Sequence, residues 1–276
     1  MISIYEKYAD FVRSFSGWCD RVLRDAVVRR ASIVGLILYV GTTLFWASPA
    51  YAAIALDTSF ELNSGNSVSV SPAYYSATIG ASATAICVGN QGAVSASDST
   101  TNVEIGTISG TSTATREGGA QAPSDRYEDA WCLLNPPTGA HVTIKITFTG
   151  TFASSYASSY SGVGSIDGAS TATHASASSF ALPVTTTVNN AWAWSVADNA
   201  NAGPTAGTGT TLRQTNAGGG MSIGDSNGAI ATAGSYTMNW SQGTSGTWAG
   251  TIVALEPPVA AAAAPFMPFL MFFGQW

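Results

Sequence analysis

Charge is scarce in this 276-residue chain: Asp, Glu, Lys and Arg make up 9% of it, and the formal net charge is −6. Beyond Ala52 only four residues are basic, against twelve acidic ones. Nucleic-acid binding depends on clustered Lys and Arg side chains that neutralise phosphates, so this composition argues against a nucleic-acid partner. The four basic residues are Arg116, Arg126, Lys145 and Arg213.

Histidine is equally rare, with only His141 and His174 in the whole chain. Neither lies in a context that suggests a nucleophile, a base and an orienting acid, so no catalytic triad is indicated. Paired carboxylates are the remaining catalytic option, because glycosidases use two of them. The densest acidic group is interleaved with arginines and is more typical of a solvated loop; it contains Glu117, Asp125, Glu128 and Asp129.

Three cysteines are present, and only Cys87 and Cys132 follow Ala52. An even pair in an exported chain favours a disulfide, and each cysteine lies in a run typical of a strand. We therefore predict a buried Cys87–Cys132 link between neighbouring strands or facing sheets. Two buried, unpaired thiols are the alternative.

One long uncharged stretch is present, at residues 31–52, and it follows Arg29 and Arg30. It ends at Ala50-Tyr51-Ala52, which is a small-x-small cleavage signal, so we predict export with cleavage before Ala53. The alternative is a retained signal anchor, since the stretch is long enough to cross a bilayer. Residues 1–30 carry apolar side chains at helical spacing and predict an amphipathic helix that contacts the membrane if cleavage does not occur.

Beyond Ala52 the chain is rich in Thr, Ser and Gly and shows no helical periodicity. Residues 142–148 alternate apolar and polar side chains, which is typical of a strand with one buried face. Residues 127–134 and 152–161 also read as strands, and the run 251–255 is apolar on both faces, which favours a central strand. A dozen or so such segments predict an all-β fold, a two-sheet antiparallel sandwich of jelly-roll type.

We expect one domain over residues 53–256, preceded by the helical signal or anchor segment. Residues 257–276 form a Pro/Ala linker and an apolar tail, from Pro265 to Trp276, that is too short to span a membrane. An exposed apolar tail is unfavourable in water, so we expect it to dock on its own domain, a membrane surface or a second copy. Insertion into a neighbouring subunit would produce self-association.

Several segments resemble a group of exported β-sandwich domains found in surface proteins of environmental bacteria. The segments are residues 206–213 (AGTGTTLR), 223–228 (IGDSNG), 248–256 (WAGTIVALE), 131–139 (WCLLNPPTG) and 159–163 (SYSGV). The resemblance covers most of residues 53–256 and implies a jelly-roll-like fold and a surface location. It implies no activity and no functional residues.

Two weak ligand sites follow from residue types. Turns at Asp225, Asn227 and Asp198 supply the oxygen atoms that Ca²⁺ prefers, so calcium is the one cofactor the sequence suggests, although Asx-Gly turns alone explain the pattern. Aromatic side chains over a concave sheet would bind sugars, and the candidates are Tyr74, Tyr75, Tyr156 and Tyr160. Core packing explains tyrosines in strands at least as well.

From these observations we predict an exported, non-enzymatic protein of the cell surface that acts in adhesion or as a structural subunit. Its expected partner is an extracellular glycan or protein. A carbohydrate-binding module and a polysaccharide-active enzyme are the alternatives.

Overall fold

The computed structural model describes Val12, Ser14 and residues 53–92, 99–107, 110–122, 127–216 and 220–259. The chain divides into two units, Met1–Ala50 and Tyr51–Trp276. The helix expected over residues 1–30 lies outside the described residues, Val12 and Ser14 excepted, and so do the apolar segment 31–52 and the tail 265–276. No helix in the described part of the chain has the length and apolar character needed to cross a membrane.

The second unit is built from antiparallel strands in three hydrogen-bonded sheets, so the predicted all-β antiparallel fold is confirmed. Sheet A has the order β1-β9-β3-β7-β6, sheet B the order β2-β8-β4-β5, and sheet C the order β10-β15-β11-β14-β13 with β12 on β15. The strands of sheet A are β1 (Ala55–Asn63), β3 (Ala85–Gly92), β6 (Thr115–Gln121), β7 (Tyr127–Leu134) and β9 (Phe152–Ser161). Those of sheet B are β2 (Ala73–Ile79), β4 (Ser99–Thr107), β5 (Gly110–Thr113) and β8 (Gly139–Thr149). Sheet C contains β10 (Ser165–Thr186), β11 (Trp192–Asn199), β12 (Thr205–Ala206), β13 (Thr211–Thr215), β14 (Met221–Asp225) and β15 (Gly234–Glu256).

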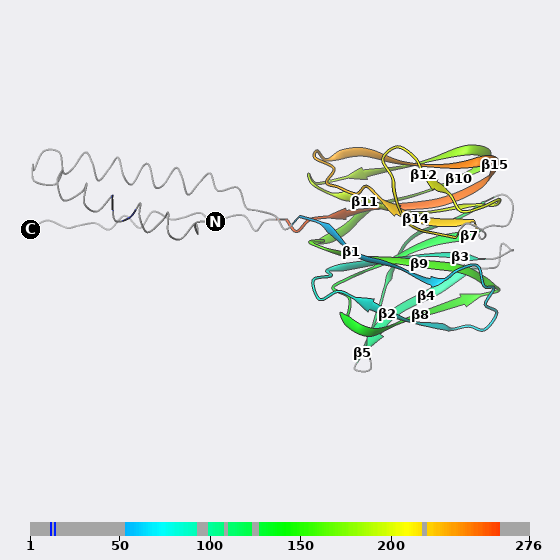
Figure 1. Cartoon of the computed structure of the whole chain (residues 1–276), viewed down its shortest axis with the longest axis horizontal. Helices are drawn as coiled ribbons and strands as arrows, with labels where there is room; N and C mark the ends of the chain where they lie inside the picture. Colours follow the sequence, from blue (N-terminus) through cyan, green and yellow to red (C-terminus); the bar gives the residue numbers. More distant parts are fainter. Residues whose placement is uncertain are drawn as a thin grey trace, which may run out of the picture. The chain divides into compact units, whose positions relative to one another are not determined.

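Sheet A is the middle layer, with sheet B on one face and sheet C on the other (Figure 1). The core shared with sheet B contains Val88 and Trp131 of sheet A and Ile144 of β8. The core shared with sheet C contains Tyr156 and Trp194. Sheets pack face to face as the sandwich prediction requires, but there are three where two were expected, because sheet A is covered on both faces.

Sheet C also packs against itself. β10 and β15 pair along their whole length, from Ser165 opposite Glu256 to Thr186 opposite Gly234, with register shifts between His174 and Ser179. Beyond these shifts the pair turns back over its own first half. A Cβ atom on Gly250 would lie only 2.6 Å from Phe180 Cε1, so glycine is needed for this close approach. The resulting third core contains Phe180, Leu182, Met238, Trp240, Trp248 and Ile252.

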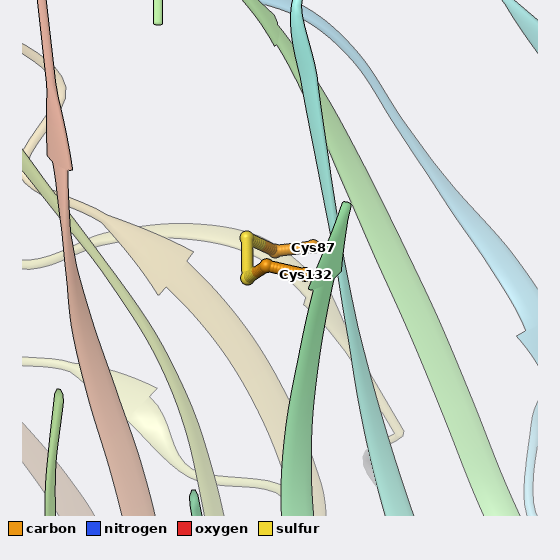
Figure 2. The surroundings of a disulfide bond; sticks show 2 residues. All are labelled: Cys87 and Cys132. Carbon is orange, nitrogen blue, oxygen red and sulfur yellow. A yellow bond between two sulfur atoms is a disulfide. The ribbon is translucent and has the colours of Figure 1, made fainter. Parts of the chain in front are cut away.

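The predicted disulfide is confirmed. Cys87 of β3 lies directly opposite Cys132 of β7, and the two sulfur atoms are bonded. Figure 2 shows the link between the two neighbouring strands, and both cysteines are buried. The bond therefore fastens the two strands of sheet A that are covered on both faces.

Replacing both cysteines with alanine (C87A/C132A) should lower the free energy of unfolding by about 4 kcal/mol, because the bond closes a long loop in the unfolded chain. The two cysteines are 45 positions apart. Urea denaturation measures the loss. A reductant should destabilise the wild-type protein and leave the double variant unchanged; equal wild-type midpoints with and without reductant would contradict the prediction.

Candidate functional site

The acidic group suggested by the sequence is divided by the fold. Asp125 lies outside the described residues, and Glu117 is half-buried on β6, where desolvation raises its pKa. Glu128 and Asp129 are adjacent on β7 and fully buried. Successive side chains of a strand point to opposite faces, so these two carboxyl groups face different layers. They cannot flank one glycosidic bond as the two carboxylates of a glycosidase do.

Glu128 faces sheet C. The hydroxyl of Thr251 on β15 donates to Glu128 Oε1 at 2.7 Å. Gln91 lies opposite Glu128 in β3, and its amide donates to Asp198 Oδ1 on β11 at 2.8 Å. All four side chains are fully buried. These contacts are hydrogen bonds between the layers, made where no water reaches.

Desolvation raises the pKa of Glu128 well above its ordinary value, and the nearby Asp129 and Asp198 raise it further. The hydrogen bonds from Thr251 and from the backbone of Ala120 act in the opposite direction but are outweighed. Burial therefore favours the neutral form of Glu128, which accepts a hydrogen bond from sheet C.

Asp129 faces sheet B in a second polar row. Asn90 Nδ2 donates to Asp129 Oδ1 at 2.9 Å, and the hydroxyl of Ser155 donates to Asn90 Oδ1 at 2.8 Å. Burial raises the pKa of Asp129 to about 6, although the hydrogen bond from Asn90 favours the charged form. This row connects β7, β3 and β9 of sheet A by side-chain hydrogen bonds.

The oxygen atoms of Asp225 and Asn227, which the sequence suggested as calcium ligands, contact the guanidinium group of Arg213. Arg213 of β13 donates from Nε to Asp225 Oδ2 and from Nη2 to Asp225 Oδ1, both at 2.7 Å. Nη2 also donates to Asn227 Oδ1 at 2.7 Å, and the hydroxyl of Tyr160 donates to Asp225 Oδ2 at 2.8 Å. The oxygen atoms proposed for Ca²⁺ thus bind a guanidinium group and a phenol. A bidentate Arg–carboxylate pair is a strong, geometrically specific interaction.

Asp198, the third proposed calcium ligand, lies between sheets A and C and accepts from Gln91. Among the described residues, no three His, Cys, Asp or Glu side chains are grouped so that they could hold a metal ion. The sequence located the oxygen atoms but not their partner, because Arg213 precedes Asp225 by twelve residues on another strand.

The four candidate sugar-binding tyrosines have different fates. Tyr156 and Tyr160 are fully buried between sheets A and C, which corrects their assignment, since a ligand in solution cannot reach them. Tyr75 is half-buried and packs on the core between sheets A and B. Tyr74 is 64% exposed. Period-two alternation places Tyr74 and Tyr75 on opposite faces of β2, so only Tyr74 can meet a ligand.

A pocket lies beside the end of β10, between residues 187–190 and 257–259. Its lining consists of Thr, Val, Asn and Pro side chains, and none of them is charged. Such a lining offers amide and hydroxyl groups but neither an acid nor a base at neutral pH. It carries no catalytic chemistry of its own.

No protein-family model, curated protein or solved structure matches this chain.

Glu128→Gln should change how stability depends on pH. A carboxyl whose pKa is raised on folding stabilises the fold fully below its unfolded pKa, near 4.5 for Glu128, and this contribution is lost as pH rises through the folded pKa. Glutamine cannot ionise and still accepts from Thr251. As pH rises above about 4.5, melting temperatures should therefore fall less steeply in the variant than in the wild type.

Asp129→Asn should reduce the pH dependence of stability over a lower pH range, from the unfolded pKa near 3.8 to the folded pKa of about 6. Glu61→Gln is the matched control, because Glu61 is exposed on β1. Identical pH profiles for the wild type and Glu128→Gln would contradict this interpretation of the buried acid.

Arg213→Met should cost about 3 kcal/mol of unfolding free energy, because it leaves the carboxylate of Asp225 buried without its cation. The double variant R213M/D225N should recover part of that loss, since no uncompensated charge remains. Urea denaturation measures both. Lys145→Met is the control for a surface ion pair and should change stability little; an equal loss in the two single variants would contradict the assignment.

Proposed function

We propose that this chain is an exported cell-surface protein that acts in adhesion or as a structural subunit and catalyses no reaction. One observation carries the proposal. The buried carboxyl groups that resembled catalytic or metal sites are hydrogen-bonded to other side chains of the fold, as Glu128, Asp129, Asp198 and Asp225 show. They serve the cohesion of the fold, and the best-supported role for such a domain is mechanical or adhesive.

The disulfide supports an extracellular location, because such bonds persist in oxidising compartments. The uncharged segment 31–52 supports export, either as a cleaved signal or as a retained anchor. The antiparallel sheets support the resemblance to exported jelly-roll-like domains, which belongs to this proposal as well. We also propose that the chain self-associates through residues 265–276.

Surface shaving tests the location. Intact cells that make the full chain are treated with a protease, and the released peptides are identified by mass spectrometry. Peptides from residues 53–259 are expected from intact cells, and none from a cytoplasmic control protein. Detection of these peptides only after lysis would overturn the surface location.

A gene deletion tests the role. Cells without the chain should attach to surfaces less well or show a weakened envelope, and both wild-type protein and Glu128→Gln should restore the phenotype. A polysaccharide-degrading activity of the purified chain that Glu128→Gln or Asp129→Asn abolishes would overturn the non-enzymatic proposal.

A further inference from the structure

The outer face of sheet B is open to solvent. The inner face of this sheet supplies Val103, Ile105, Val142, Ile144 and Ile146 to the core. By alternation the intervening residues point outward, and no described element packs on them. On this face Tyr74, Thr143 and Thr113 are exposed. Sheet B is the lowest layer in Figure 1.

Four side chains form a straight row across this face. Tyr74 of β2 lies opposite Lys145 of β8, Lys145 lies opposite Glu104 of β4, and Glu104 lies opposite Thr113 of β5. Neighbouring strands are spaced about 4.8 Å apart, so the row extends roughly 14 Å. It presents a ring, an aliphatic stem, a carboxylate and a hydroxyl in succession.

The ion pair in the middle of the row, Lys145 and Glu104, is partly buried against the sheet. Lys145 Nζ donates to Glu104 Oε2, and the two side chains are 32% and 21% exposed. The pair is neutral as a whole and still has hydrogen-bonding capacity. Tyr74, at the end of the row, is 64% exposed, so its ring is more accessible to a ligand than the ion pair beside it.

A second row runs beside the first and is rich in hydroxyl groups. Ser76 lies opposite Thr143, Thr143 lies opposite Gly106, and Gly106 lies opposite Thr111. None of these residues is charged. The two rows together form a flat surface with one aromatic ring, one neutral ion pair and several hydroxyls.

From this surface, which we call the Tyr74 strip (Tyr74, Lys145, Glu104, Thr113 and the row beside them), we infer that the protein binds a neutral polysaccharide. Sugar rings have apolar CH faces that pack on an aromatic ring, and hydroxyls that hydrogen-bond to the ion pair and to threonines. The partner is thus the glycan surface that an adhesive protein would meet, so the inference rests on the proposed function.

Other ligand classes fit the strip less well. A phosphate-bearing or acidic polymer needs clustered cations, and the only lysine here is already paired. A membrane or an apolar protein surface needs a contiguous apolar patch. Among the described residues of the second unit, the other exposed large apolar side chains lie outside the strands of sheet B, namely Val70, Leu212 and Val259.

Affinity electrophoresis tests the inference with the purified full chain and gels that contain xylan, mannan, β-1,3-glucan or hydroxyethyl cellulose. We expect retardation by at least one neutral polysaccharide. Tyr74→Ala should weaken it about tenfold or more, and Tyr74→Trp should preserve it, because the larger ring keeps the stacking surface. Added salt should have little effect, since the ligand is uncharged.

Val70→Ala is the matched control, because Val70 is 74% exposed but lies outside the strands of sheet B. Melting temperatures confirm that the variants are folded. Absence of retardation in every neutral gel would overturn the inference, and so would unchanged binding by Tyr74→Ala. Preference for alginate that disappears with salt would also overturn it and indicate an acidic ligand.

The two proposals fail separately. If the chain is surface-exposed and supports attachment but binds no neutral polysaccharide, only the inferred binding at the Tyr74 strip is overturned. A chain that binds through Tyr74 in the purified state but lies inside the cell overturns only the proposed location.

Discussion

Burial of sheet A on both faces is the constraint on which the rest of this structure depends. Every position of β3 is buried, and so is most of β7 and β9. Small residues let the layers approach: a Cβ atom on Gly89 would lie 2.9 Å from Met221 Cε of sheet C. Because water is excluded from both faces, each polar side chain in this sheet needs a partner within the protein or must become neutral.

That constraint explains the chemistry of the interior. Burial favours the neutral form of Glu128, Asn90 donates to Asp129, and Arg213 pairs with the carboxylate of Asp225. Each group that would look reactive in isolation forms a contact between strands or layers. Hydrogen bonds of this kind add little net stability, but their loss is costly, so they favour one register of the sheets over its alternatives.

Much of the fold could be predicted because β-branched and aromatic residues between turn signals indicate strands from the local sequence alone. The segments expected at 127–134 and 152–161 coincide with β7 and β9, and 142–148 lies within β8. The central position of 251–255 was also correct. The number of layers was not predictable, since a strand buried on both faces lacks a period of two and does not reveal what covers it. The hydrogen bonds of Asp225 and the burial of Tyr160 were not predictable for a related reason: Arg213 and the core around Tyr160 lie on other strands.

The same packing determines where recognition can occur. Sheets A and C contact each other at both edges. At one edge Gln214 of β13 donates to the Ser59 carbonyl of β1. At the other, β6 and β10 approach so closely that a Cβ atom on Gly118 would lie 2.8 Å from Thr171. Sheet B packs on sheet A through its inner face alone, and no described element packs on its outer face. The outer face of sheet B carries hydroxyl groups, one exposed aromatic ring and a paired lysine and glutamate. If sheet B binds a neutral glycan as proposed, the contact would depend on hydrogen bonds and ring packing more than on electrostatic attraction.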